Sequence, residues 1–306
     1  MVKIGIIGAH TPIAGEIIRI LIHHPETELV CLYSPANLGK NAASIHHGLI
    51  GEETLNFTDK LNLEDIDLLI ITENTEINNK IVEAASEIEG LKIILTSKNT
   101  LNSDQLKYYE AGLSEINRKP LVRGVKEAYI LSPTIVPALI ALAPLATFLL
   151  LNSDIDIEVS APEDILKELD LNKEITEVEN QLKKRQTSFN GKISLKVTPL
   201  SSSDRGMNTQ ITMSNLLPVE EIEKIYEQIY DDHNFTYITK SEISPEEVEG
   251  TQKVVINISK PSAELLSLKV VSDARLRGGA GDVVHVMNLF FGLHEKTGLT
   301  LKASKY

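Results

Sequence analysis

Short, almost uninterrupted apolar segments alternate with helical segments over the first hundred residues. The apolar segments predict strands at residues 2–8, 28–33, 55–57, 66–72 and 91–96. Between them, residues 15–24 and 76–89 have the spacing of apolar side chains that is typical of a helix buried on one face. Apolar strands that are each followed by a helix indicate a parallel sheet covered on both faces. We therefore predict an α/β, Rossmann-type doubly wound domain.

The pattern changes after about residue 146, where apolar residues occupy alternate positions. This spacing predicts strands at 154–160, 192–200, 208–214, 253–259 and 266–272. Helices are expected near 163–187 and 218–232, and a last helix within 276–299 could return to the first domain. The second half is thus predicted to be an α+β domain with a mixed, largely antiparallel sheet. We place the domains at 1–132 with 274–306, and at 133–273.

The segment 130–145 joins the two patterns. It begins as a strand, turns at a Ser-Pro-Thr sequence and continues as an apolar helix that Pro137 and Pro144 are expected to interrupt. A helix N-terminus after such a turn suits a nucleophile, because its amides and dipole stabilise developing negative charge. Here Ile135 occupies that place, and Thr134 is the hydroxyl beside it, with no general base visible in the sequence.

Composition excludes several classes of partner and site. The chain has 30 Lys and Arg against 43 Asp and Glu, a net charge of −13, which argues against nucleic acid or an anionic membrane as partner. Its single cysteine, Cys31, excludes an intramolecular disulfide and a multi-cysteine zinc site, and no other residue grouping has metal-ligand spacing. Residues 4–9 lack a signal-peptide pattern, and 135–151 are short for a spanning helix. A cytoplasmic location is expected.

A glycine-containing loop opens the first predicted helix, at "GIIGAHTPIAGE", residues 5–16. This is the position of a dinucleotide phosphate loop. Gly8 would permit the tight turn, and Ala14 is small enough for close packing of helix on strand. The middle glycine of the motif is replaced by Thr11, and Pro12 removes one amide donor. We expect Thr11 either to narrow the loop or to offer its hydroxyl to a phosphate.

The second predicted strand ends at Tyr33-Ser34, where an NAD enzyme has an acidic residue for the ribose 2′-hydroxyl. Ser34, Asn37 and Lys40 could instead meet a 2′-phosphate, so that any cofactor is expected to be NADP rather than NAD. An ordinary polar loop is the alternative explanation of these residues.

Six segments, in order along nearly the whole chain, resemble N-acetyl-gamma-glutamyl-phosphate reductase, the arginine-pathway branch of the semialdehyde dehydrogenase family. They are "HHPETELV", "SIHHGLIGE", "GLSEIN", "SPTIVPALIALAPL", "SSDRGMNTQI" and "RGGAGDVVHVMNLFFGLHEKTGL". The last one is similar to the family pattern Lys-Gly-Ala-Ala-Gly-Gln-Ala-Val-Gln-Asn-Met-Asn. The resemblance implies an NADP-binding domain that includes Gly279 and Gly281, a dimerising substrate domain, and a homodimer or homotetramer.

The resemblance also implies phosphorylating aldehyde dehydrogenase chemistry, which needs a cysteine thiolate, a histidine acid/base and a hydride from NADPH. The family's Asn-Pro-Gly-Cys-Tyr-Pro-Thr matches residues 132–138, which places Ile135 at the nucleophile. Its His-x-His stretch best matches residues 172–178, which places Asn172 and Glu174 at the histidines. Cys31, on the second strand, fits a small buried apolar residue better than a substitute nucleophile. The catalytic cysteine and histidine are therefore expected to be lost.

Two further positions are compared with the family's substrate-binding residues. The family's Asp-x-Ser-x-Asp-x-Arg stretch matches residues 95–101, where Ser97 is kept and the charged residues are gone. Arg205 lies in an Asp-Arg-Gly sequence that matches the family. It could bind a phosphate or carboxylate with two hydrogen bonds, or pair with an acid at the domain interface.

These observations favour a pseudoenzyme, a folded relative that has lost acyl-phosphate reduction and now binds NADP or a partner such as an active reductase paralogue. The alternative is an NADP-dependent oxidoreductase that transfers hydride directly, without a thioester. A purely structural oligomerisation partner is the third hypothesis, which the altered loop at Thr11 and Pro12 keeps open.

Overall fold

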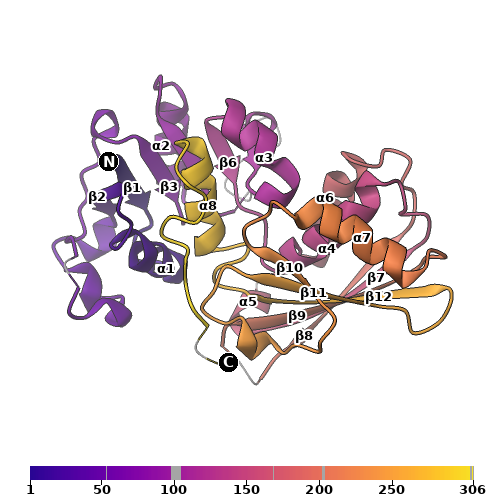
Figure 1. Ribbon diagram of the computed structural model, residues 1–306. Coiled ribbons are helices and arrows are strands. Elements are labelled where there is room, and N and C mark those ends of the chain that lie inside the picture. The colour runs from indigo at the N-terminus through magenta and orange to yellow at the C-terminus, as the bar shows by residue number, and fades with distance from the viewer. Residues whose placement is uncertain (53, 98–104, 168, 202–203, 304, 306) are drawn as a thin grey trace. The chain divides into compact units, whose positions relative to one another are not determined.

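The computed structural model describes all 306 residues except 53, 98–104, 168, 202–203, 304 and 306. It divides into two compact units, each described here by itself (Figure 1). Unit 1 consists of residues 1–131 and 279–300, and unit 2 consists of residues 132–278 and 301–306.

Unit 1 is built on a six-stranded sheet in which every neighbouring pair is parallel. The strand order is β2-β1-β3-β4-β6-β5, with strands β1 (Val2–Ile7), β2 (Thr27–Tyr33), β3 (Leu68–Ile71), β4 (Lys92–Leu95), β5 (Glu110–Ala111) and β6 (Glu127–Tyr129). Every residue of β3 is buried, which is why its sequence is apolar throughout instead of alternating.

The helices of unit 1 are α1 (Pro12–Leu21), α2 (Glu76–Ser86), α3 (Ser114–Arg123) and α8 (Ala280–Phe290). The crossover through α1 leads from β1 to β2, whereas the crossover through α2 leads from β3 to β4, in the opposite direction along the sheet. Right-handed crossovers therefore place α1 and α2 on opposite faces. Helix α8, which follows all of the strands of unit 2, packs against α1 and α3.

Unit 2 contains a second six-stranded sheet in the order β10-β11-β12-β9-β7-β8. Its strands are β7 (Ile155–Ala161), β8 (Ile193–Pro199), β9 (Gly206–Ser214), β10 (Thr236–Thr239), β11 (Val254–Ser259) and β12 (Leu265–Asp273). The outer pairs are parallel and the inner pairs are antiparallel. The predicted fold class, a Rossmann-type sheet plus a mixed sheet, is confirmed.

The helices of unit 2 are α4 (Val136–Thr147), α5 (Glu163–Leu166), α6 (Leu171–Lys183) and α7 (Val219–Tyr230). Helix α4 contacts α6, α7 and strands β9 and β12, so that it lies at the centre of the unit's core. The predicted helix at 163–187 is two helices, α5 and α6. The predicted strand at 55–57 is not a strand, because Asn56 forms only an isolated bridge to Asn41, and the following Thr58 forms only one to Tyr33.

The expected interruption of α4 by its prolines is wrong, since the helix continues through Pro144. Proline lacks the N–H that would bond to the carbonyl oxygen four residues earlier, Ile140. In this structure the Tyr230 hydroxyl of α7 donates a hydrogen bond to that oxygen. The Tyr226 hydroxyl donates one to the next carbonyl oxygen, that of Ala141, at 2.5 Å. The Tyr230 hydroxyl thus replaces the missing backbone donor, and a buried proline is accommodated.

Candidate functional site

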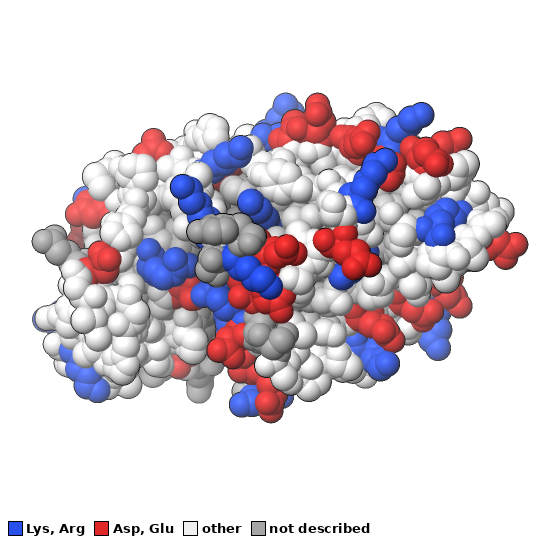
Figure 2. Space-filling model, turned by 60° about the horizontal axis from the view of Figure 1, so that its bottom comes forward, with Lys and Arg blue, Asp and Glu red and all other residues white. Residues whose placement is uncertain are grey.

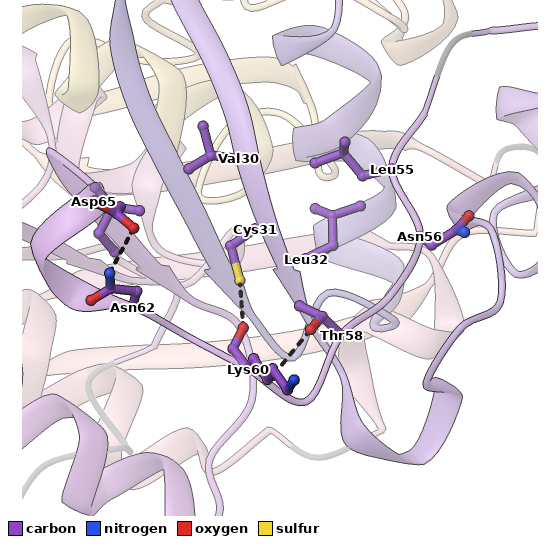
Figure 3. Close-up of a pocket in the computed structure, with 10 residues that line it drawn as sticks. Val30, Cys31, Leu32, Leu55, Asn56, Thr58, Lys60, Asn62 and Asp65 are labelled. Carbon is purple, nitrogen blue, oxygen red and sulfur yellow. Dashed lines mark hydrogen bonds between the residues drawn. The ribbon is translucent and has the colours of Figure 1, made fainter.

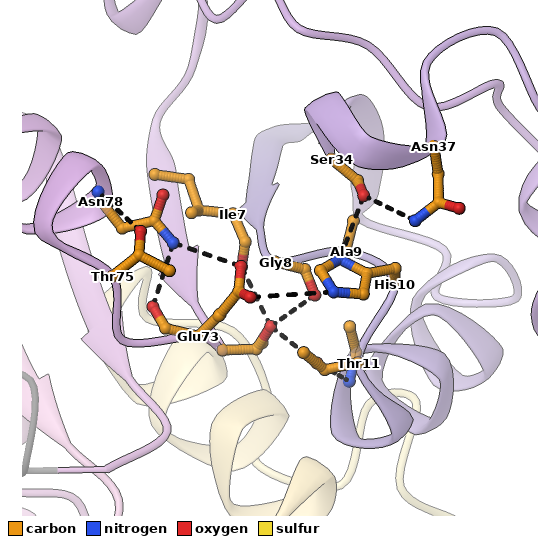
Figure 4. A network of polar contacts seen from close by, with 12 residues as sticks. Ile7, Gly8, Ala9, His10, Thr11, Ser34, Asn37, Glu73, Thr75 and Asn78 are labelled. Atoms are coloured by element: carbon orange, nitrogen blue, oxygen red, sulfur yellow. Dashed lines mark hydrogen bonds and ion pairs between the residues drawn. The ribbon is translucent and has the colours of Figure 1, made fainter.

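The order of the strands in unit 1 reverses at β1, which lies between β2 and β3. Ligands of open α/β sheets bind at such a point, beside the carboxyl ends of the strands. The loops that follow these three strands contain Gly8, Ser34 and Glu73, and a network of polar contacts joins them (Figure 4). This edge is the candidate cofactor site.

Gly8 makes the tight turn that the motif predicts. Its φ angle is +72°, in the region that favours glycine, and a Cβ atom there would lie 2.6 Å from the Cβ atom of Glu73 and 2.8 Å from Thr72 Oγ1. Both the backbone conformation and the close approach of the loop after β3 therefore require glycine. Ala14, the other small residue of the motif, is fully buried in the first turn of α1.

The hydroxyl of Thr11 is used inside the protein. It accepts a hydrogen bond from the Ala14 amide at 3.3 Å, which caps α1, and it donates to Thr72 Oγ1 at 2.8 Å. Thr11 thus caps helix α1, and a contact of its hydroxyl with a phosphate stays a prediction. Within the described part of the chain, the amides of His10 and Ile13 donate no hydrogen bond, which leaves two backbone donors for an anion at this helix N-terminus.

His10, which sequence reasoning did not single out, links the loops after all three strands. Its Nδ1 atom lies 3.0 Å from Ser34 Oγ, and its Nε2 atom lies 3.8 Å from Glu73 Oε1 (Figure 4). Ser34 is only 1% exposed and also accepts a hydrogen bond from Asn37. Ser34 Oγ thus lies within this network, and its contact with a 2′-phosphate stays a prediction. The exposed group of this loop is Lys40, whose Nζ donates to Asn37 Oδ1 at 3.2 Å.

A separate cavity of about 400 Å³ lies beside β2 (Figure 3). Its lining residues come from β2 and from the segment 55–66, and the phosphate loop takes no part in it. Cys31 points into this region, and its Sγ donates to the carbonyl oxygen of Lys60 at 3.5 Å. Burial raises the pKa of the Cys31 thiol to about 11. At neutral pH this sulfur is protonated and is a poor nucleophile.

In unit 2, the turn before α4 brings together two hydroxyls and a carboxylate. Thr134 Oγ1 donates to Glu174 Oε2 at 3.1 Å, and Ser132 Oγ lies 2.8 Å from Thr134 Oγ1. Thr134 is 0% exposed, whereas Ser132 and Glu174 are half-buried. Ile135, which follows Thr134, is 1% exposed. The expectation of a single hydroxyl without a base is wrong, because Glu174 reaches the turn from α6.

Sequence reasoning missed this cluster for two reasons. The first reason is that Ser132, in the Ser-Pro-Thr sequence of the turn, was the one sign of a second hydroxyl and was not considered as a site residue. The contact of Glu174 with Thr134 spans 40 residues and depends on how α4 and α6 pack, which no local pattern reveals. Asn172, the other position matched to a family histidine, is exposed at the start of α6.

Arg205 pairs with an acid of its own unit. Its Nε donates to Asp273 Oδ2 at 2.8 Å, and Asp273 is 0% exposed. The same oxygen accepts the Gly250 amide at 2.6 Å, while Oδ1 accepts the Arg275 amide at 2.8 Å. Buried carboxylates are stable only when paired in this way. The Arg205 side chain therefore pairs within unit 2, at the end of β12, and its binding of a phosphate or carboxylate ligand stays a prediction.

The remaining predicted site residues lie at ends of elements. Ser97 is half-buried two residues after β4, and residues 98–101 of the stretch compared with the family lie outside the described residues. Gly279 is the N-cap of α8, and Gly281 is buried in its first turn. The positions 202–203 beside Arg205 also lie outside the described residues.

Acidic and basic side chains are mixed over the face drawn in Figure 2. In the part of the chain that the structure describes, no helix is long and apolar enough to cross a membrane. The described residues likewise contain no group of three or more His, Cys, Asp or Glu that could hold a metal ion.

Comparison with solved structures shows the fold. Aspartate semialdehyde dehydrogenase II of Vibrio cholerae, complexed with ASA, matches with a TM-score of 0.74 and 13% identity over 95% of this chain and 98% of that chain. The aspartate semialdehyde dehydrogenase of Candida albicans with NADP matches with a TM-score of 0.66 and 15% identity over 95% and 98% of the two chains.

Comparison of sequences goes further. Residues 3–124 match the model of the semialdehyde dehydrogenase NAD binding domain. The N-acetyl-gamma-glutamyl-phosphate reductases of Bacteroides fragilis (strain YCH46) and Parabacteroides distasonis are each 32% identical over 328 aligned residues, which cover 100% of both chains. With the Gly8 turn at a strand-order reversal, a semialdehyde dehydrogenase fold and this full-length identity, the chain belongs to the semialdehyde dehydrogenase family and is related to its N-acetyl-gamma-glutamyl-phosphate reductases.

Proposed function

We propose that this chain has lost the thiol-dependent acyl-phosphate reduction of its relatives and acts as an NADP-binding or partner-binding pseudoenzyme for that reaction. The observation that carries the proposal is the state of its only thiol. Cys31 is buried on β2, and its thiol donates a hydrogen bond to the backbone carbonyl oxygen of Lys60. Burial raises the pKa of this thiol to about 11. At pH 7 roughly one such thiol in ten thousand would be ionised.

The position matched to the family's cysteine offers no replacement thiol. Ile135 has a hydrocarbon side chain that is 1% exposed, so it neither attacks a carbonyl nor contacts solvent. The position matched to the second histidine is Glu174, whose Oε2 atom accepts a hydrogen bond from Thr134 Oγ1. Without a thiol, no thioester forms to receive hydride, and family-type reduction stops before its first step.

The cofactor part of the proposal rests on the edge of unit 1. The residues present fit a dinucleotide there, because Gly8 makes the tight turn after β1 and the amides of His10 and Ile13, at the start of α1, donate no hydrogen bond within the described part of the chain. These amides would hold the pyrophosphate, and the exposed Lys40 would meet a 2′-phosphate. When bound, the nicotinamide of NADPH supplies a hydride. The family match over residues 3–124 supports this assignment.

The first test is calorimetric titration of the purified chain with NADPH, and with NADH in parallel. We expect NADPH to bind more tightly than NADH, and Lys40→Ala to remove that preference while Lys119→Ala, another exposed lysine of unit 1, leaves it unchanged. Absence of binding by either nucleotide would overturn the cofactor assignment. Reduction of N-acetylglutamyl phosphate with NADPH at an enzyme-like rate would overturn the loss of thiol chemistry.

The second candidate is an NADP-dependent oxidoreductase that transfers hydride directly to a ketone, imine or aldehyde. It is favoured because the candidate cofactor site lies entirely within unit 1. Binding of NADPH at that site would need no thiol. NADPH oxidation with one member of such a panel would establish it. For assembly we propose a homodimer or homotetramer, or association with an active reductase paralogue, which size-exclusion chromatography with light scattering would distinguish.

A further inference from the structure

The two hydroxyls before α4 form a directed chain of hydrogen bonds. Thr134 Oγ1 donates to Glu174 Oε2, and a threonine hydroxyl has a single proton to donate. Thr134 then has no proton left for its 2.8 Å contact with Ser132 Oγ. Ser132 must be the donor in that contact. The hydrogen bonds are therefore donated from Ser132 to Thr134 and from Thr134 to Glu174.

The burial of Thr134 and the partial exposure of Ser132 both favour activation of Ser132 as a nucleophile. Thr134, the middle member, is 0% exposed, so water does not compete for its hydroxyl. Ser132, the outer member, is half-buried and is the end that a small substrate could reach. A hydroxyl hydrogen-bonded to a base through a fixed partner is the arrangement that makes serine nucleophilic. In its hydrogen bond with Thr134, Ser132 Oγ is the donor. Its lone pairs are therefore available to attack a substrate.

We propose that Ser132 is an acyl-accepting nucleophile, that Glu174 is its general base acting through Thr134, and that this site hydrolyses acyl phosphates without a cofactor. The choice of acyl phosphates rests on the proposed function, since they are the substrates that a reductase-related chain without a thiol would still bind. The hydroxyl chain itself is independent of NADP, because all three residues belong to unit 2.

The reaction balances in two steps. Ser132 Oγ attacks the acyl carbon while its proton moves to Thr134 and the Thr134 proton moves to Glu174. The bond from carbon to the phosphate oxygen breaks, and the phosphate leaves with the electron pair and takes the proton from Glu174. In the second step Glu174 takes a proton from water, the resulting hydroxide attacks the Ser132 ester, and that proton returns through Thr134 to Ser132. The products are a carboxylate and inorganic phosphate, and the carboxylic acid releases its proton to solvent.

The experiment measures phosphate release from acetyl phosphate by the full chain without nucleotide. We expect Ser132→Ala to abolish release above the buffer rate, and Glu174→Gln and Thr134→Val each to lower it about 100-fold or more. Thr134→Ser keeps a hydroxyl and should retain most of the rate. The matched control is Ser160→Ala, which removes one hydroxyl from the exposed Ser160–Thr198 pair at 2.9 Å and should leave the rate unchanged.

Circular dichroism and thermal unfolding of each variant establish that it folds, and mass spectrometry of quenched reactions should find an acetyl group on the peptide that contains Ser132. Equal phosphate release by Ser132→Ala and the unaltered chain would overturn the proposal, as would the absence of release above buffer from the folded, unaltered chain. NADPH oxidation that accompanies acetyl phosphate consumption would instead contradict the proposed loss of reduction, so the two failures are distinguishable.

Discussion

The hydroxyl of Tyr230 donates a hydrogen bond to the carbonyl oxygen of Ile140, the oxygen that a backbone amide at position 144 would otherwise contact. We expect Tyr230→Phe to lower the free energy of unfolding by about 1–3 kcal/mol, because a buried carbonyl loses its donor. Urea denaturation measures this change. In a Pro144→Ala background the amide returns, and the cost of Tyr230→Phe should fall clearly. Equal costs in both backgrounds would show that Tyr230 acts only by packing.

The carboxylate of Glu73 stands at the edge where a cofactor phosphate is proposed to bind, 3.8 Å from the His10 imidazole. Its negative charge opposes a phosphate at that place. We expect Glu73→Gln to tighten NADPH binding several-fold in calorimetry, with a larger gain at low salt than at high salt. Glu89→Gln, an exposed carboxylate of the same unit, is the control and should change little. A weaker affinity in Glu73→Gln would mean that Glu73 helps to hold the nucleotide.

Glu295 makes the stability of unit 1 sensitive to acid. A hydrogen bond and charge attraction from His285, together with Arg118, lower the pKa of Glu295 to about 2. Since the folded pKa lies below the ordinary value near 4.5, the stabilisation is present above pH 4.5 and is lost as the pH falls towards 2. Its size is on the order of 3 kcal/mol at most. Urea midpoints at pH 7, 5 and 3.5 should fall less steeply in Glu295→Gln than in the unaltered chain.

The control for that series is Glu158→Gln, because Glu158 pairs with Lys196 on the surface, where both side chains are more than half exposed. Such pairs contribute little to stability. Parallel slopes for all three proteins would show that Glu295 does not titrate with folding.

Cys31 should behave as a buried thiol. Because burial raises the pKa of the Cys31 thiol to about 11 and the thiol donates a hydrogen bond to the carbonyl oxygen of Lys60, we expect a thiol reagent to label the native chain slowly at pH 7.5. The unfolded chain in denaturant should react at the rate of a small thiol. Rapid labelling of the native protein would contradict the low nucleophilicity on which the proposed function rests.

Much of the fold follows from local patterns. The strands of unit 1 are recognisable because burial on both faces leaves them apolar throughout, as in β3, and the strands of unit 2 because one face is polar. β10 was missed because four residues, Thr236–Thr239, are too few to show alternation. The continuation of α4 through Pro144 could not be predicted, since it depends on tyrosines more than 80 residues away.

The candidate sites divide in the same way. Gly8 was predictable, because a tight turn after a first strand imposes a local conformation. The bridging position of His10 was not, since Ser34 and Glu73 come from other loops that only the sheet brings together. The base for Thr134 was missed for that reason as well. Sequence patterns report a residue's own conformation, whereas chemistry between loops requires the packed structure.

Helix α8 also constrains how the protein is made. It is translated after every strand of unit 2, yet it packs against α1 and α3 of unit 1. During translation, the apolar surface of unit 1 that α8 covers would therefore stay exposed while unit 2 emerges from the ribosome and folds. The sheet that is synthesised first thus receives helix α8 only after all of the strands of unit 2 have been made, and chaperones would find their binding surface on the face that α8 finally covers.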